Sequence, residues 1–171
     1  MSARAHPTYA LRPFLPADAT LLAAIFRASI EELTSEDYDE SQREAWASAA
    51  DDEQAFGARL ADELTLVATV EGSPIGFLSL EGTDKLDMLY VHPAVAGQGV
   101  GAMLVDAIEK LAASRGAKRL VVDASETARP FFEKRGYVGQ QRNTVMLGGE
   151  WLANTTMEKH LTPREGAGSL S

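Results

Sequence analysis

A mixed α/β fold, with helices on both faces of one sheet, is predicted by three features of the sequence. Seven segments have the apolar or alternating patterns of strands, and the segments between them carry apolar residues at helical spacing. The order is a strand, two or three helices, three strands, a helix, a strand, a helix and two strands. The 171 residues contain no repeat and no internal linker. We therefore expect one domain over residues 1–161 and a disordered tail over 162–171.

The N-terminal third is expected to be mostly helical. A first strand over residues 8–14 is followed by apolar residues at helical spacing from Leu22 to Leu33. Ser41 and Glu44 form a capping-box pattern that predicts a second helix. A further short helix is expected to end near residue 60.

The rest of the chain alternates strands and helices. Residues 65–70, 75–80 and 85–92 are predicted strands, and the turn sequences EGSP and EGTD between them indicate an antiparallel meander. A long helix is expected from Val100 to the residues before Gly116, and another over 126–135 before Gly136. Residues 120–123, 137–142 and 151–160 are the last predicted strands.

The composition disfavours several classes of function. The formal net charge is −9, so sequence-independent binding to nucleic acid phosphates is not expected. No segment approaches the roughly 18 apolar residues of a membrane span. Cysteine is absent, which excludes disulfides and cysteine-ligated metals, and the three histidines are scattered. We expect a cytoplasmic protein without a metal.

The most informative segment joins the strand over residues 86–92 to the helix that begins at Val100. It contains three alternating glycines in GQGVGA, residues 97–102. Glycine permits positive φ and removes the Cβ atoms that would hold a ligand away. The first turn of a helix adds free N–H groups and the positive end of its dipole. This segment therefore predicts a phosphate site that needs no basic side chain.

A dinucleotide is one phosphate ligand that fits the spacing. Gly97, Gly99 and Ala102 match the G-x-G-x-x-A fingerprint, and Asp123 ends the next strand. That alternative would make the protein a dinucleotide-dependent oxidoreductase. Against it, residues 93–96 separate the strand from the first glycine. Only 48 residues follow Asp123, too few for the remaining parallel strands and helices.

Two stretches resemble a known family. LDMLYVHP at residues 86–93, followed by GQGVGA, resembles the acetyl-CoA signature of the GCN5-related N-acetyltransferase (GNAT) superfamily. ARPFFEKRGY at 128–137 resembles the family's CoA-side helix, and residues 38–46 and 151–159 resemble a bacterial small-substrate subgroup. The resemblance covers about residues 8–161. It implies a mostly antiparallel, twisted sheet splayed around the CoA site, and acetyl transfer from acetyl-CoA to a small-molecule amine.

The resemblance also implies site residues. The main chain of Leu89, Tyr90 and Val91 would pair with the pantetheine arm as an added strand does. Phe131 would line the pantetheine or acetyl end, while Tyr38 and Trp46 lie where the acceptor is expected. The exposed late strands suggest a possible homodimer. The phosphate end would be formed by Ala96, Gly97, Gln98, Gly99, Val100, Gly101 and Ala102.

Three departures from the family pattern leave the proton transfers open. Lys85 stands where a Glu base is frequent, Ala96 where Arg or Gln is usual, and Phe132 where a Tyr acid is frequent. Without that acid and base, a CoA-binding regulatory module without turnover is an alternative.

Asp87 is the candidate base. Strand alternation is expected to place it on the same face as residues 85 and 89, and a structural pair with Lys85 is the alternative role. Tyr137, Tyr90 or water would protonate the leaving thiolate.

Overall fold

The structure is a computed structural model that describes residues 8–162. The expected tail therefore lies outside the described residues from position 163 on. The strands are β1 (Tyr9–Pro13), β2 (Leu64–Val70), β3 (Ser73–Glu81), β4 (Lys85–Val91), β5 (Arg119–Ser125), β6 (Val138–Leu147) and β7 (Glu150–His160). The helices are α1 (Ala19–Leu33), α2 (Glu40–Ala47), α3 (Glu53–Asp62), α4 (Val100–Ser114) and α5 (Arg129–Lys134). None of these helices is both long and apolar enough to cross a membrane.

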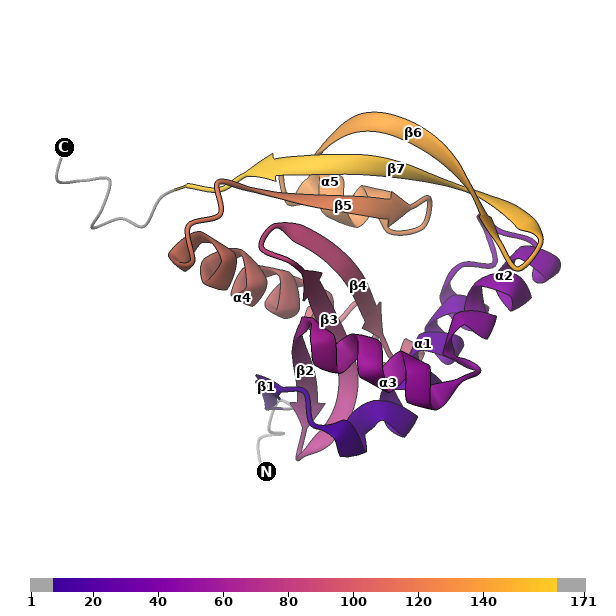
Figure 1. The fold of residues 1–171 in the computed structure, drawn as a ribbon, viewed down its shortest axis with the longest axis horizontal. Coiled ribbons are helices and arrows are strands. Elements are labelled where there is room, and N and C mark those ends of the chain that lie inside the picture. The colour runs from indigo at the N-terminus through magenta and orange to yellow at the C-terminus, as the bar shows by residue number, and fades with distance from the viewer. Residues whose placement is uncertain (1–7, 163–171) are drawn as a thin grey trace, which may run out of the picture.

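One sheet contains all seven strands, in the order β1-β2-β3-β4-β5-β7-β6. The predicted meander is confirmed, because β2, β3 and β4 pair antiparallel. At the centre, β4 and β5 pair in parallel through only two positions, Lys85 with Val121 and Leu86 with Val122. Beyond these positions the two halves of the sheet diverge (Figure 1). This opening positions the functional site.

Two hydrophobic clusters hold the helices against the sheet. One includes Leu104 and Ile108 of α4 with Leu120 of β5. The other includes Ile30 of α1 and Phe77 of β3, and it also contains residues of α2 and α3. Burial of both apolar helix stripes against the sheet provides the main stabilising contribution. The mixed fold predicted from the sequence is confirmed.

A β-bulge interrupts β4 at Asp87. Ser79 pairs with Met88 and Leu80 pairs with Leu86, so Asp87 has no partner on β3. Because a bulge adds one residue to a strand, side chains two positions apart across the bulge point to opposite faces of the sheet. Leu86 accordingly belongs to the α4 cluster, whereas Met88 belongs to the α1 cluster. The expectation that residues 85, 87 and 89 share one face is therefore wrong.

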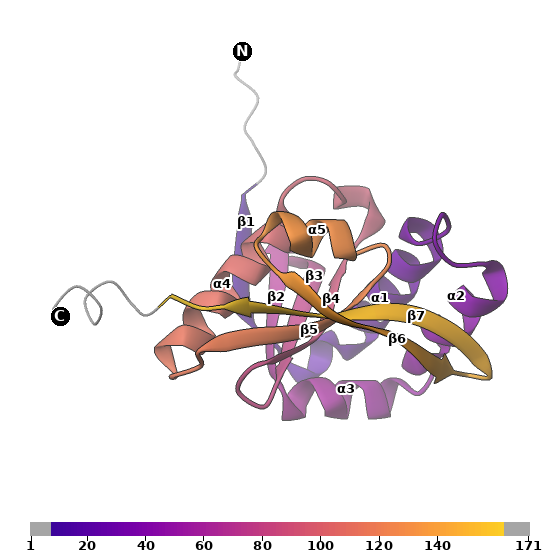
Figure 2. The same ribbon diagram turned by 90° about the horizontal axis from the view of Figure 1, so that it is seen from above.

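The last two strands form a longer hairpin than expected. β6 continues to Leu147 instead of ending at residue 142, and Gly148 and Gly149 close the turn with φ of 51° and 84°. Residues 138–144 of β6 are mostly polar and exposed at the sheet edge, so apolar alternation marks this strand only at residues 145 and 147. The hairpin curves over the molecule until its turn lies beside α2 (Figure 2).

The start of α2 is also displaced from the prediction. The capping box uses Asp39 and Gln42, not Ser41 and Glu44. The Gln42 N–H donates to Asp39 Oδ1 at 2.8 Å, and the Asp39 N–H donates to Gln42 Oε1 at 2.9 Å. The C-terminal ends of α4 and α5 lie where the sequence predicts them. Gly116 and Gly136 follow these ends with φ of 95° and 94°.

Candidate active site

A cavity of about 540 Å³ lies where β4 and β5 diverge. Its walls come from β4, the start of α4, β5, α5, the α1–α2 region and the β6–β7 hairpin. The structure brings ten of the expected cofactor residues to this cavity: Leu89, Tyr90, Val91, Ala96, Gly97, Gly99, Val100, Gly101, Ala102 and Phe131.

The glycine turn forms one end of the cavity. Gly97 and Gly99 have φ of 79° and 89°, a conformation that side chains other than glycine rarely adopt. The first helical hydrogen bond runs from the Met103 N–H to the Gly99 carbonyl at 3.0 Å. The N–H groups of residues 100–102 therefore have no carbonyl acceptor within the helix. A Cβ on Gly101 would lie 3.6 Å from the Phe131 ring. This geometry fits a pyrophosphate held by main-chain donors.

Gln98 is the one expected cofactor residue that the structure does not bring to the cavity. Its N–H donates to the Val95 carbonyl at 3.2 Å. Its side-chain Oε1 accepts the Tyr9 hydroxyl at 2.7 Å. The N–H and the side-chain oxygen of Gln98 are thus both hydrogen-bonded to the protein. Gln98 stabilises the turn on the side that faces away from the cavity.

The divergent edge of β4 is free to pair with an extended ligand. The His92 N–H donates to the Ile75 carbonyl at 2.8 Å. Alternate residues of an antiparallel strand point their main-chain groups the same way, so those of Leu89 and Val91 point away from β3. β5 pairs with only Lys85 and Leu86 of this strand. The pantetheine arm fits this edge as an added strand.

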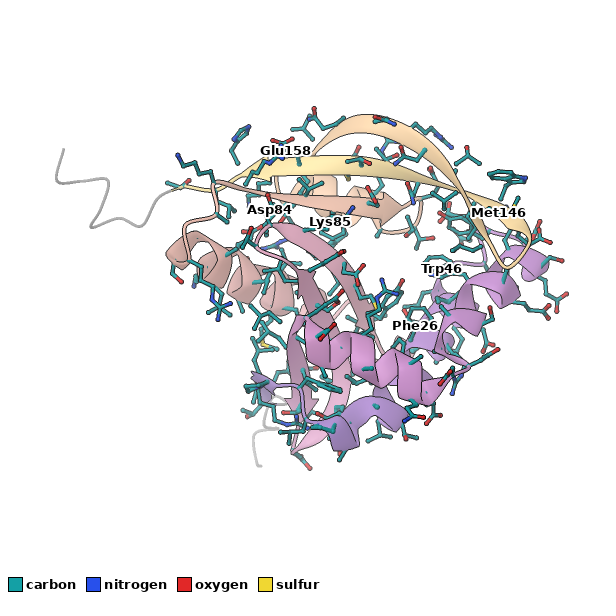
Figure 3. The ribbon with its side chains drawn as sticks, viewed as in Figure 1. Phe26, Trp46, Asp84, Lys85, Met146 and Glu158 are labelled. Atoms are coloured by element: carbon teal, nitrogen blue, oxygen red, sulfur yellow. The ribbon has the colours of Figure 1, made fainter. Side chains whose placement is uncertain are left out.

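The opposite end of the cavity is aromatic. Tyr38 and Trp46 both line it, and their ring centroids are 5.3 Å apart in an edge-on arrangement. The Trp46 indole N–H donates to the Tyr90 hydroxyl oxygen at 3.2 Å. Burial raises the pKa of Tyr90, so this phenol stays protonated. Figure 3 shows Trp46 on α2, below the arch of the hairpin.

The hairpin closes this end by hydrogen bonds to the α1–α2 region. The Tyr38 hydroxyl donates to the Ala153 carbonyl at 2.6 Å and accepts the Glu126 N–H at 2.9 Å. The Gln42 side-chain amide donates to the Trp151 carbonyl at 2.8 Å. The sequence prediction missed the hairpin's contribution to the wall, although apolar alternation at residues 145 and 147 was a signal. These hairpin residues are Val145, Leu147, Leu152, Ala153 and Asn154.

Asp87 lies at the cavity wall but has a different partner from the one expected. Arg59 of α3 donates to its carboxylate from Nη2 at 2.7 Å and from Nε at 3.0 Å. Lys85 instead pairs with Asp123 of β5 at 3.0 Å. Because of the bulge, Asp87 lies on the α3 side of the strand rather than beside Leu89.

Tyr137 is not brought to the cavity. Its hydroxyl donates to Glu109 Oε2 of α4 at 2.8 Å, and Lys159 Nζ lies 3.0 Å from the same carboxylate group. Tyr137 is absent from the cavity wall that the described residues form. The interpretation of Tyr137 as the leaving-group acid therefore has no geometric support. Phe132, at the position expected for the family acid, is buried.

Asp123 does not form the ribose site that a dinucleotide would need. Its carboxylate accepts the Thr156 hydroxyl at 2.6 Å and pairs with Lys85. Most neighbouring strands are antiparallel, in contrast to a dinucleotide-binding sheet. The dinucleotide alternative therefore fails on topology.

Comparison with known proteins agrees with this geometry. The family model described as "Acetyltransferase (GNAT) domain" matches residues 34–161. A GCN5-related N-acetyltransferase from Rhodopseudomonas palustris has a similar structure, with 61% identity, a TM-score of 0.88 and coverage of 94% of this chain and 99% of that one. The uncharacterized N-acetyltransferase YafP of Escherichia coli is 33% identical, over 86% of this chain and 93% of YafP.

A further relative is described as the peptidyl-lysine N-acetyltransferase YjaB of Salmonella typhimurium, with 29% identity over 75% of this chain and 73% of YjaB. More distant structures with the same fold were solved with CoA or acetyl-CoA bound. The chain belongs to the GNAT acetyltransferase family, and it is an acyltransferase.

Proposed function

We propose that the protein is a cytoplasmic N-acetyltransferase that acetylates the amine of a small molecule with an apolar body. The observation that carries this proposal is the acceptor end of the cavity, which the hairpin covers. Tyr38 and Gln42 tie the hairpin to the α1–α2 region, and the wall there is aromatic and aliphatic. A mainly apolar pocket covered by a hairpin suits a small molecule better than an extended polypeptide.

The charges around the cavity support an amine without an acidic group. Among the described residues, the charged side chains at the wall are Asp87 and Asp123, and neither Lys nor Arg lines it. A carboxylate or phosphate on the acceptor would therefore have no cationic partner. The two carboxylates already pair with Arg59 and Lys85. The faces of Tyr38 and Trp46 are therefore the feature that favours a cationic ammonium group.

The site residues have distinct roles in the proposed reaction. When bound, acetyl-CoA supplies the thioester carbonyl that the amine attacks. The main chain of Leu89 and Val91 orients the pantetheine arm, and the N–H groups of residues 100–102 bind the pyrophosphate. Asp87 accepts a proton from the ammonium group, and the Leu89 N–H polarises the carbonyl. Holding the amine and the thioester close together in a reactive orientation supplies much of the rate enhancement.

The proposed acceptor class is tested by measuring thiol release from acetyl-CoA with a matched panel of acceptors. We expect aryl-alkyl and alkyl amines to give a higher kcat/KM than the corresponding amino acids and than a lysine-containing peptide. A preference for the peptide, as the description of YjaB would suggest, would overturn the small-molecule assignment. Tight acetyl-CoA binding without transfer to any acceptor would favour the regulatory module.

The role of Asp87 is tested by the pH dependence of Asp87→Asn. A base is needed only while the amine is protonated, so this variant should lose kcat mainly below pH 9. Asp123→Asn is the matched control, because it removes the other carboxylate of the cavity wall. An Asp87→Asn profile parallel to that of the wild type at every pH would exclude Asp87 as the base.

A further inference from the structure

We propose that Glu63 is a positioning residue for Asp87 and stores the proton that Asp87 removes from the acceptor amine. Glu63 follows directly after α3 and precedes β2. This inference rests on the proposed amine acetylation, which gives Asp87 a proton to pass on.

The bulge in β4 turns Asp87 toward a group of carboxylates. Oxygen atoms of Glu63, Glu81 and Asp87 lie within 4.8 Å of one another. The Glu63 and Asp87 side chains are only 10% and 12% exposed, whereas Glu81 is exposed. Two carboxyl groups so close and so shielded from water cannot both ionise without strong repulsion, and one bound proton relieves that repulsion.

Two buried oxygen atoms beside this pair have no partner among the described residues. They are Glu63 Oε1 and the hydroxyl of Ser79, a residue of β3 with 0% exposure. Buried polar atoms are nearly always hydrogen-bonded. A proton on Glu63 would convert one acceptor into a donor and allow a hydrogen bond with Asp87 or Ser79. The Ser79 hydroxyl can donate to Glu63 whether or not Glu63 carries a proton. The closeness of the Asp87 carboxylate is therefore what favours a protonated Glu63.

The surrounding charges are consistent with a proton on Glu63 rather than on Asp87. Arg59 contacts Asp87 in a bidentate pair, but its Nε lies 3.9 Å from Glu63. Burial, and then the hydrogen bond and charge of Asp87, raise the pKa of Glu63 to about 7, against the smaller opposing effects of the Ser79 hydroxyl and of Arg59. Glu81 of β3 is a further charged group close to the pair. A carboxyl group that titrates near neutral pH can accept and release a proton during turnover.

The proton balance of amine acetylation gives this pair a defined task. The C–N bond forms and the C–S bond breaks, while the ammonium nitrogen loses two protons. One proton ends on the thiolate sulfur of CoA. The other passes from the amine to Asp87, then to Glu63 and finally to solvent, so that Asp87 is ionised again for the next acceptor.

A cation held by the three carboxylates is the competing use of this cluster. The guanidinium of Arg59 already lies against Asp87 and close to Glu63, so the cluster has a resident positive charge. A divalent metal would have to displace it. We therefore favour proton storage, and the experiments below include a metal arm.

The first experiment is an NMR pH titration of protein labelled with ¹³C at the Glu carboxyl groups, which needs no turnover. We expect one carboxyl signal with a midpoint near pH 7 in the wild type and in Glu81→Gln, the matched control at an exposed position. The signal should vanish in Glu63→Gln and shift to lower pH in Asp87→Asn. A neutral-range signal that survives Glu63→Gln, or one that does not respond to Asp87→Asn, would overturn the proposal.

The second experiment is the pH profile of kcat/KM for an amine that the panel identifies. Glu63→Gln should lower kcat/KM about tenfold at pH 7 and have little effect at pH 9, and Glu63→Asp should recover part of the loss. A purely structural role would instead lower the rate equally at each pH. Loss of wild-type activity in EDTA, restored by Mg²⁺ or Mn²⁺, would show a metal site and overturn the proposal. If the wild type acetylates no amine, the proposed function falls, while the titration still decides whether the carboxyl pair exists.

Discussion

The two ends of the cavity are built in different ways. The donor end is formed largely by one contiguous segment, Leu86–Ala102, with Phe131 of α5 beside it, and it offers mainly main-chain groups and missing Cβ atoms. The acceptor end is formed by side chains from remote segments, such as Tyr38 and Ala153, which are 115 residues apart and joined by a hydrogen bond. A local sequence pattern can encode a backbone cradle, whereas a side-chain pocket depends on how distant segments pack.

This difference separates the functions of the two ends. In the proposed function, the donor end binds a part of acetyl-CoA that is the same for every acceptor. The acceptor end is free to vary, since its wall depends on a few side chains of the α1–α2 region and on the β6–β7 hairpin. Substitutions at the two ends should therefore have separable effects on acetyl-CoA binding and on acceptor use.

The largest effect is expected from Gly101→Val at the donor end. A Cβ there already contacts the Phe131 ring at 3.6 Å, and the branched methyl groups would fill the space in front of the first-turn N–H groups. We expect the Kd for acetyl-CoA, measured calorimetrically, to rise at least about 100-fold, or about 3 kcal/mol. Gly101→Ala should weaken binding less, and Gln98→Ala, whose side chain faces Tyr9, should bind normally. Unchanged affinity in Gly101→Val would contradict the assigned phosphate site.

The next largest effect is expected from Trp46→Ala at the acceptor end. This change removes an aromatic wall and the N–H donor to Tyr90, so kcat/KM for an apolar amine should fall about 10-fold, or about 1.4 kcal/mol. Trp46→Phe keeps the aromatic surface and should lose less. Steady-state kinetics with each substrate varied would check this. If the Kd for acetyl-CoA changes by as large a factor as kcat/KM for the amine, the two ends of the cavity do not act separately.

A smaller effect is expected from Tyr38→Phe, which releases the hairpin without removing the ring. The variant loses hydrogen bonds to the Ala153 carbonyl and the Glu126 N–H. At about 1 kcal/mol per hydrogen bond, the free energy of unfolding should fall by about 1–2 kcal/mol. Urea denaturation would measure that loss, and the KM for the amine should rise modestly. An unchanged midpoint would show that these bonds do not hold the hairpin.

The smallest effect is a pH-dependent gain in stability in Glu63→Gln. The pKa of Glu63 is raised to about 7 in the folded protein, above its ordinary value of about 4.3. Its contribution to stability is therefore present at low pH and is lost as the pH rises through 7. Removing the carboxylate should raise the Tm at pH 8 by roughly 2–4 °C, allowing for solvent screening, and by less at pH 5. Equal Tm differences at both pH values would count against the raised pKa.

The sequence predicted the fold class, the meander and the backbone conformation of the glycine turn because each depends on local patterns. Gly97 and Gly99 take the positive φ that their spacing indicated. The sequence could not show the bulge at Asp87, since strand alternation assumes one partner for each residue. It also could not place Tyr137, whose hydroxyl is engaged by Glu109 on another helix. The roles of Arg59 and Glu63 likewise depend on packing between α3 and β4.

Hydrogen–deuterium exchange with and without acetyl-CoA tests the contrast between the two ends most directly. The donor end contains main-chain N–H groups without a carbonyl acceptor in the helix, and such groups exchange more slowly once a ligand accepts from them. We expect acetyl-CoA to protect the amides of residues 89–102 while leaving those of α2 and the hairpin turn nearly unchanged. Protection confined to α2 and the hairpin, with residues 97–102 exchanging as in the free protein, would contradict the account.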